Sequence, residues 1–256
     1  MVDVASRAVL GGERAGRSRL GDRVLLAVSD GLGGQPGGEI ASAVVVETLA
    51  RAMLWGRTAT PREDLLDAAV QVAHRAVQQA AVTHGKLGMG ATLVAALVDG
   101  PTAYVAEVGD SRVYLLRGGS LAQISHDQSM VQAMIDEGLM DAEDKRTFPF
   151  RSVILQSMGM DGAPRVALRR VDLRRGDLIL LCSDGLTELV PDPDIKRVLL
   201  AAPRLDVACS ALVDLANARG GVVNITVVLA KAGGELPPGR AGETIASTVE
   251  VLRSFA

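Results

Sequence analysis

Residues 23–34 read RVLLAVSDGLGG, and residues 177–187 read DLILLCSDGLT. In both stretches an apolar run ends in Ser-Asp-Gly-Leu, which places an aspartate at the end of each predicted buried strand. An apolar strand can hold a terminal carboxylate at the rim of a core, and the following Gly lets the backbone turn sharply. One Asp-Gly pair alone predicts an ordinary turn. Two such strand ends side by side would place Asp30 and Asp184 in an oxygen-rich site for Mg²⁺ or Mn²⁺.

A third candidate carboxylate lies in residues 108–112, Val-Gly-Asp-Ser-Arg, between two predicted hairpin strands. One interpretation is a tight turn in which Asp110 bonds to its own backbone. The other is that Asp110 joins the cation site formed by the two strand ends.

Length and composition limit the number of domains, the kind of core and the possible partners. The 256 residues suit one large α/β domain, or one domain with a small insertion. Aromatic residues make up 2% of the chain and apolar residues 48%, so the core must be largely aliphatic. A net charge of −3 and a single small arginine group, Arg14, Arg17 and Arg19, give no basic face, so no nucleic-acid partner is expected.

The two cysteines and the hydropathy bear on the compartment. Cys182 lies in an apolar run and is predicted to be a core residue. Two cysteines suggest a reducing, cytoplasmic environment without a disulfide. No apolar run approaches the ~18 residues of a transmembrane helix, so no membrane partner is expected.

The distribution of strand and helix signals predicts the fold class. Gly100-Pro101 and Gly118-Gly119 separate short central strands in the manner of hairpin turns. Strands and helices come in clusters, which predicts an α+β fold of packed antiparallel sheets flanked by helices. The strands are expected at 2–10, 23–29, 91–98, 102–108, 111–116, 120–124, 152–156, 165–171, 178–183 and 222–230. The helices are expected at 39–55, 62–83, 127–147, 192–201 and 204–218, with a turn at 11–22.

We expect one domain over residues 1–231. The tail, residues 232–256, begins with a Gly- and Pro-rich linker. Its end, residues 244–252, is expected either to add a strand or to dock a partner.

Five segments resemble, in order, the motifs of bacterial metal-dependent Ser/Thr protein phosphatases (type 2C, the PPM family). The segments are DGLGGQPGGEIAS (30–42), GATLVAALV (90–98), VGDSRVYLLRGGSLAQISHDQSMV (108–131), DLILLCSDGLTELV (177–190) and GGVVNITVV (220–228). One motif would be weak, whereas five in the family order over roughly residues 20–230 form a specific signal.

The resemblance implies an α-β-β-α sandwich and a two-metal centre that activates water to hydrolyse phosphoserine or phosphothreonine in a protein. By this match Asp30 would bridge two Mn²⁺ or Mg²⁺ ions, the Gly31 carbonyl would bind the second, and Asp184 the first. Asp110 would join Asp184 at a weaker third ion. The substrate would be a phosphoprotein, such as the product of a Ser/Thr kinase. The acidic stretch 127–147 would take the place of the family's mobile flap.

The chain departs from the family motifs at three positions. Val223-Asn224 replaces the last Asp-Asn, so one carboxylate ligand of the first metal is lacking. Phe148-Pro149 stands where His-Pro is common.

The third departure concerns the opening Arg-x-x-Asn-[Glu/Gln]-Asp motif. Arg17 and Asp22 have its spacing, but Asp22 would lie roughly 25 Å from Asp30 along one strand. Asp3 fits if strand 2–10 pairs with 23–29 as a hairpin, in which case the phosphate-binding Arg is missing. An active phosphatase and a catalytically impaired pseudophosphatase that binds a regulatory partner both remain open. A small-molecule phosphatase on the same scaffold is a third alternative.

Overall fold

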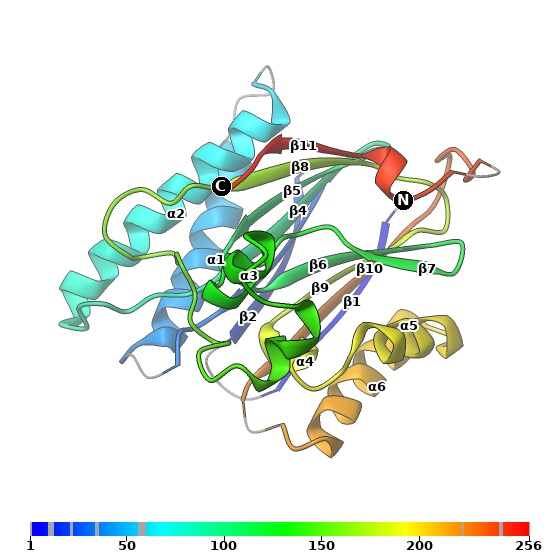
Figure 1. Ribbon diagram of the computed structural model, residues 1–256. Helices are drawn as coiled ribbons and strands as arrows, with labels where there is room; N and C mark the ends of the chain where they lie inside the picture. Colours follow the sequence, from blue (N-terminus) through cyan, green and yellow to red (C-terminus); the bar gives the residue numbers. More distant parts are fainter. Residues whose placement is uncertain are drawn as a thin grey trace.

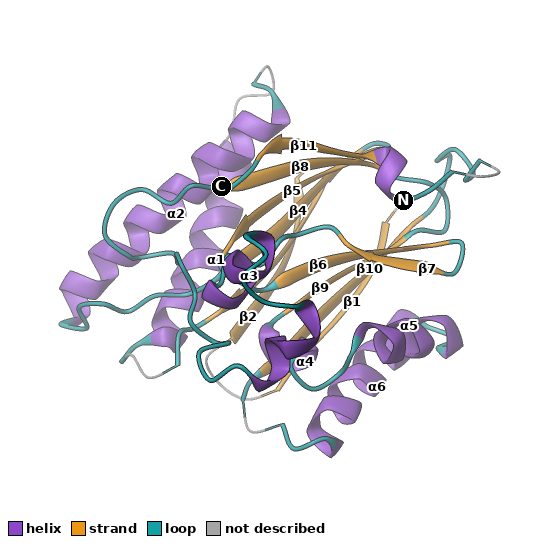
Figure 2. Ribbon diagram, viewed as in Figure 1, coloured by secondary structure: helices purple, strands orange, loops and turns teal. Residues whose placement is uncertain are grey.

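Two antiparallel sheets face each other and carry helices on their outer sides, as the computed structural model shows (Figures 1 and 2). The predicted fold class is therefore confirmed. The structure describes residues 2–9, 13–20, 23–33, 36–55, 60–221, 223–240 and 243–255. For β1 and β2, below, it describes the backbone.

The smaller sheet has the strand order β1-β10-β9-β6-β7, and the larger has β11-β8-β5-β4-β3-β2. The strands of the smaller sheet are β1 (Val2–Val9), β10 (Ile225–Ala232), β9 (Leu178–Cys182), β6 (Arg112–Arg117) and β7 (Ser120–Gln123). Those of the larger sheet are β11 (Val249–Arg253), β8 (Ala167–Asp172), β5 (Thr102–Val108), β4 (Leu93–Asp99), β3 (Arg23–Asp30) and β2 (Glu13–Leu20).

Two long helices, α1 (Gly38–Trp55) and α2 (Arg62–His84), cover the outer face of the larger sheet. On the other side α5 (Asp192–Ala201) and α6 (Leu205–Ala218) cover the smaller sheet. Short helical turns complete the described elements: α3 (Met130–Asp136), η1 (Ala142–Thr147), α4 (Asp184–Thr187) and η2 (Ala246–Thr248).

The apolar side chains form three layers, and β4 shows how one strand serves two of them. Leu93, Ala95 and Leu97 face the helices α1 and α2. Val94 and Ala96 alternate with them and face the other sheet. Alternate side chains of a strand point to opposite faces, so a strand buried on both sides reads as a continuous apolar run. This explains why the aliphatic strands that end near Asp30 and Asp184 could be predicted from the sequence.

The first strands correct the sequence interpretation. Residues 11–22 were expected to form a turn, whereas Glu13–Leu20 is strand β2 and pairs with β3 along its whole length. Strand β1 pairs with β10 in the smaller sheet, so the expected hairpin with 23–29 is wrong. Asp3 consequently lies opposite Lys231 and not beside Asp30. Pairing along a sheet edge has overridden the low strand propensity of a Gly- and Arg-rich sequence.

The segment between β7 and β8 also differs from its prediction. The expected helix 127–147 is divided into α3 and η1, with Gly138 at φ +69° between them. The Ser129 hydroxyl caps α3 by accepting a hydrogen bond from the Gln132 N–H. The expected strand 152–156 is reduced to a single bridge between Ile154 and Ser129.

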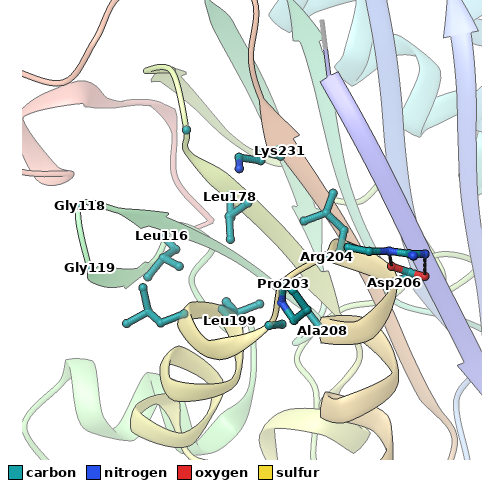
Figure 3. Close-up of a pocket in the computed structure, with 14 residues that line it drawn as sticks. Leu116, Gly118, Gly119, Leu178, Leu199, Pro203, Arg204, Asp206, Ala208 and Lys231 are labelled. Carbon is teal, nitrogen blue, oxygen red and sulfur yellow. Dashed lines mark hydrogen bonds and ion pairs between the residues drawn. The ribbon is translucent and has the colours of Figure 1, made fainter.

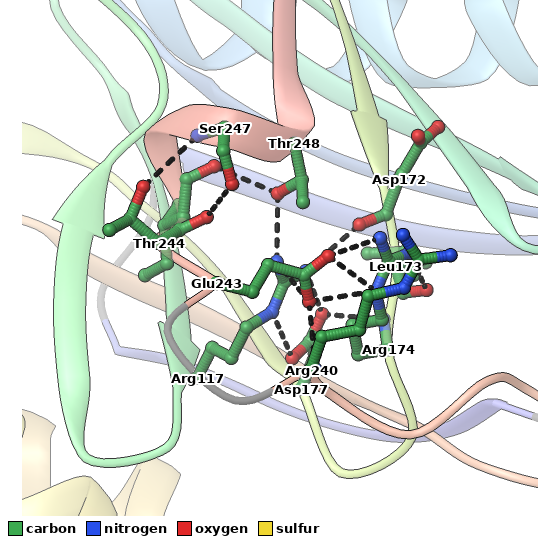
Figure 4. Close-up of polar contacts among 11 residues, drawn as sticks. Arg117, Asp172, Leu173, Arg174, Asp177, Arg240, Glu243, Thr244, Ser247 and Thr248 are labelled. Atoms are coloured by element: carbon green, nitrogen blue, oxygen red, sulfur yellow. Dashed lines mark hydrogen bonds and ion pairs between the residues drawn. The ribbon is translucent and has the colours of Figure 1, made fainter.

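The tail packs onto the domain through partly buried polar contacts (Figure 4). The Arg174 guanidinium donates to both carboxylate oxygens of Glu243 at 2.6–3.1 Å. Arg117 donates to Asp177 at 2.6 and 2.9 Å and to the Thr248 hydroxyl at 2.8 Å.

After this anchor, β11 pairs with β8 at the edge of the larger sheet. The domain boundary after residue 231 stays a prediction. Within the described ranges, no helix combines the length and the hydrophobicity that crossing a membrane requires.

Candidate active site

Asp30 is held at the end of β3 by Thr92, which precedes β4. The Asp30 N–H donates to Thr92 Oγ1 at 3.0 Å, and the Thr92 N–H donates to the Asp30 carbonyl at 2.8 Å. The Ser29 hydroxyl donates to the Thr92 carbonyl at 2.6 Å. These bonds fix the backbone that carries the first predicted carboxylate.

Gly31 lies in a place that admits no side chain. Its backbone forms a bridge with Ala91. A Cβ at Gly31 would come within 2.3 Å of the carbonyl carbon of Gly38, at the start of α1. Glycine is therefore required by the close approach of two backbones.

Asp110 is joined to the Asp30 region by one hydroxyl contact. Thr92 Oγ1 lies 2.7 Å from the hydroxyl of Ser111, the residue after Asp110. On the other side, Gln128 holds the turn with two hydrogen bonds. Its side-chain Oε1 accepts from the Gly109 N–H at 2.7 Å, and its backbone N–H donates to the Gly109 carbonyl at 2.9 Å. Gly109 has φ +102°, a conformation that favours glycine. The turn is thus clamped between β4 and the β7–β8 segment.

Asp184 begins α4, directly after β9. At Gly185 a Cβ would approach the Asn224 carbonyl oxygen to 2.0 Å, so the start of β10 packs tightly behind Asp184. Burial, and then the negative charges of Asp184 and Asp127, raise the pKa of Asp110 to about 8. The structure therefore brings Asp110 and Asp184 close enough for their charges to oppose each other.

A cavity of about 540 Å³ opens beside these two carboxylates. It is bounded by α4 and by the β7–β8 segment. Its lining residues are Asp110, Arg112, Asp127, Ser129, Ala142, Glu143, Lys145, Arg151, Asp184, Thr187, Glu188, Leu189 and Asp192.

One wall of the cavity is a polar cluster around Asp127. The Arg112 guanidinium donates to both Asp127 oxygens, at 2.6 and 2.8 Å, and the Lys145 ammonium donates to Asp127 Oδ2 at 2.8 Å. The Gln123 amide donates to Asp127 Oδ1 at 2.9 Å. Burial opposes the ionised form of Asp127, but Arg112 and then Lys145 hold its pKa below the ordinary value. Arg112 belongs to β6, whereas Asp127 and Lys145 belong to the β7–β8 segment. The Asp127 carboxylate therefore ties this segment to β6.

Two of the four predicted site residues line this cavity. Asp110 and Asp184 line the cavity, whereas Asp30 and Gly31 are not among its lining residues and connect to it through Thr92 and Ser111. No three acidic, His or Cys residues gather as a metal-holding group among the side chains that the structure describes. Val223 is 45% exposed just before β10.

The chemistry of the donor set still suits a hard divalent cation. The Asp110 and Asp184 carboxylates and the backbone carbonyl of Gly31 supply oxygen ligands of the kind that such cations prefer. Burial first, and then charge repulsion, raises the Asp110 pKa, and a cation between Asp110 and Asp184 would relieve the repulsion.

Sequence reasoning missed the roles of Asp127, Arg112 and Lys145. The Asp127-Gln128-Ser129 string after a strand was a signal for part of this cluster. The pairing with Lys145 spans 18 positions and depends on how the segment folds back, which no local pattern encodes.

A second cavity, of about 730 Å³, is lined by a different set of residues (Figure 3). Leu116, Leu178 and Leu199 contribute apolar side chains, and Lys231 lines it as well. It holds none of the predicted site residues.

Comparisons with known proteins agree with this architecture. A sequence model described as Protein phosphatase 2C matches residues 15–205. The chain is 39% identical over 211 residues to the serine/threonine protein phosphatase PstP of Mycobacterium tuberculosis (strain CDC 1551 / Oshkosh), covering 80% of this chain. The chain spans 40% of the length of that relative. It is 34% identical to the serine/threonine phosphatase stp of Listeria innocua serovar 6a, covering 80% of this chain and 83% of the relative.

A solved structure extends the likeness to three dimensions. The catalytic domain of PstP in complex with two manganese ions superposes with a TM-score of 0.80 at 32% identity, covering 91% of this chain and 99% of that one. The family model matches well over half of the sequence, and the fold agrees across nearly all of it. The chain belongs to the protein phosphatase 2C family.

Proposed function

We propose that this chain is a Mn²⁺- or Mg²⁺-dependent phosphatase that hydrolyses phosphoserine or phosphothreonine in a protein substrate. The observation that carries the proposal is the cavity lined by Asp110 and Asp184 at the ends of two sheets. The relatives' names support it, since they are serine/threonine phosphatases from bacteria. The expected partner is a phosphoprotein made by a Ser/Thr kinase, and the expected compartment is the cytoplasm.

Four residues are proposed to hold the ions. Asp30 and the Gly31 carbonyl would take part in a pair of sites together with Asp184, and Asp110 with Asp184 would form a weaker third. Two bound ions would supply a water activated near neutral pH and would neutralise the phosphoryl oxygens. The two manganese ions in the PstP structure support this number of sites.

The protein's own contribution is to position these groups. Thr92 fixes the backbone of Asp30, and Gln128 fixes the turn that carries Asp110. Arg112 and Lys145 place positive charge on the cavity wall, where a phosphoryl group needs it. Because the Arg112 and Lys145 side chains both bind the buried carboxylate of Asp127, their positions are set before substrate arrives.

The direct test is release of phosphate from p-nitrophenyl phosphate and from a phosphopeptide at millimolar Mn²⁺. We expect turnover that Asp184→Asn and Asp30→Ala each reduce by about a hundredfold or more, which corresponds to roughly 2.7 kcal/mol. Absence of turnover, or variants that match the parent, would refute the enzymatic proposal.

A regulatory pseudophosphatase is the second candidate, and Val223 favours it. This apolar residue is exposed where the resemblance expects a carboxylate, and no group of three ligands forms among the described side chains. Titration with Mn²⁺ separates the two functions, because two tight sites support the enzyme and one weak site supports the pseudophosphatase. Val223→Asp should raise the Mn²⁺ affinity in either case, and a variant without this effect would refute the assignment of the last motif.

A further inference from the structure

The β7–β8 segment exposes apolar side chains beside the candidate active site. Met130, Phe150, Val153 and Leu155 are 36%, 59%, 37% and 39% exposed, and we call these four residues the apolar patch. The chain contains three Phe residues in all, and Phe148 and Phe150 both lie in this segment. Two of the six aromatic residues of the chain therefore lie in this segment, and Phe150 is exposed.

Backbone contacts bring the patch residues together. Ser129 and Ile154 form an antiparallel bridge, and the Met130 N–H donates to the Val153 carbonyl at 2.8 Å. The Val153 N–H in turn donates to the Phe150 carbonyl at 3.1 Å. Three of the four residues are therefore direct neighbours across two short stretches of chain.

Phe150 is supported by a second ring. Phe148 and Phe150 lie edge to face, with ring centroids 5.8 Å apart and planes at 70°. Such aromatic pairs are favourable beyond simple burial. The pair gives the patch a rigid aromatic end, which suits it to bind an apolar group with little loss of side-chain freedom.

Two patch residues are chain neighbours of residues that line the cavity. Arg151 lines the cavity and follows Phe150 in the chain. Ser129 lines it too and precedes Met130. A peptide whose phosphorylated residue reaches Asp110 and Asp184 has this surface within a few residues of the phosphate.

We propose that the apolar patch binds a large apolar side chain of the phosphoprotein substrate, located a few residues from the phosphorylated Ser or Thr. The proposal rests on the proposed phosphatase function and gives it a substrate class: phosphosites with a neighbouring Leu, Ile or Phe. The phosphate enters the polar cavity, and the neighbouring side chain packs on Phe150 and its surroundings. Aromatic residues, Phe among them, are enriched in the buried cores of protein interfaces.

The test compares two variants on three substrates. Phe150→Ala removes the aromatic end of the patch at an exposed position, and Leu54→Ala, 60% exposed on α1 and outside the cavity lining, is the matched control. The substrates are p-nitrophenyl phosphate and two phosphothreonine peptides that carry either Leu or Ala at the positions flanking the phosphoresidue.

For the parent protein we expect kcat/KM to be about tenfold higher for the Leu peptide than for the Ala peptide. Phe150→Ala should abolish this difference and leave p-nitrophenyl phosphate within about twofold of the parent. Leu54→Ala should preserve the difference. A parent without a Leu preference, or a preference that survives in Phe150→Ala, would overturn the proposal. An equal loss on all three substrates would also overturn it.

A binding measurement keeps the inference independent of turnover. Fluorescence anisotropy with the same two labelled phosphopeptides reports affinity whether or not the protein is an active enzyme. A Leu preference that Phe150→Ala removes supports the patch even where turnover is absent and the proposed function fails. Equal affinity for both peptides overturns it. A dimer in sedimentation that Phe150→Ala dissociates would assign the patch to a second copy of the chain, which also overturns it.

Discussion

Glu13 lies directly opposite Asp30 in the antiparallel pair of β2 and β3. Opposed residues in such a pair have Cα atoms only about 4.5–5.5 Å apart. The residue paired with Asp30 on this side of β3 is therefore an acidic residue, and it belongs to the strand that sequence interpretation treated as a turn. Asp3, the residue expected in that place, lies opposite Lys231 in the other sheet.

This register predicts that Glu13 contributes to cation binding. Glu13→Gln removes a negative charge opposite Asp30, and ligand charge is a main control on the affinity for hard cations. We expect the Mn²⁺ affinity to fall by about tenfold, roughly 1.4 kcal/mol, as measured by isothermal titration calorimetry. Asp3→Asn is the matched control and should leave the affinity unchanged. Equal effects of the two substitutions would contradict the prediction.

The same pair shows what could be read from the sequence. Strand β3 was legible because it is buried on both faces and reads as an unbroken apolar run. Strand β2 was not, because its residues Glu13–Leu20 include Gly16 and three arginines. Its position at the edge of the sheet gives it a single strand neighbour, β3, so it needs no such run. With residues 11–22 interpreted as a turn, Asp3 was the acidic residue expected beside Asp30, whereas Glu13 is the residue paired with it.

The site residues that follow strand ends could be predicted from the sequence. Those that depend on how the β7–β8 segment folds back could not. Asp110 and Asp184 were singled out from local motifs, and the structure places both on one cavity. Lys145 reaches the same cavity because Gly138 divides the expected helix, allowing η1 to turn back onto Asp127. Such a contact requires tertiary structure, so no periodicity indicates it.

The buried Asp127 cluster leads to a prediction about stability. Asp127 is 4% exposed and serves Arg112, Gln123 and Lys145. Asp127→Leu would leave the Arg112 guanidinium buried without its partner, and breaking such a pair costs about 3–5 kcal/mol of unfolding free energy. Lys86→Met, which removes an exposed ion pair with Glu39, should cost less than about 1 kcal/mol. Urea denaturation of both variants measures the difference, and comparable losses would contradict the role of Asp127.

His74 leads to a prediction about pH. This buried residue of α2 accepts a hydrogen bond at Nδ1 from the Gly159 N–H, at 3.0 Å, so the ring must be unprotonated at that atom. Burial lowers the pKa of His74 below 6.5. Because the folded-state pKa is depressed, the stabilisation is fully present above the unfolded value, about 6.5, and is lost as pH falls through the folded pKa.

The consequence should be visible in unfolding at two pH values. The backbone that His74 contacts leads to the candidate site. Met158, the residue before Gly159, exchanges backbone hydrogen bonds with Ala91, and Ala91 forms a bridge with Gly31. Between pH 7.5 and pH 5 the parent protein should lose more stability than His74→Gln does, as measured by urea midpoints. His84→Gln, at the exposed end of α2, should behave like the parent. A His74→Gln variant with the parent's pH dependence would contradict this.

The anchoring of the tail can be tested at Glu243. Its carboxylate binds the Arg174 guanidinium, and Arg117 lies 4.0 Å away. These contacts lower the pKa of Glu243 to about 2, with the Arg174 hydrogen bond as the main cause. Their contribution is present above the ordinary carboxylate pKa and is lost as pH falls towards 2.

Glu243→Gln should therefore release the tail near neutral pH. We expect faster cleavage of the Gly- and Pro-rich linker, residues 233–240, in limited proteolysis, because a loosened anchor exposes that backbone more often. Glu250→Gln removes only the exposed ion pair with Arg170 and should leave the cleavage rate close to that of the parent. Cleavage of Glu243→Gln at the parent's rate would mean that β11 pairing with β8, and not the ion-pair anchor, holds the tail in place.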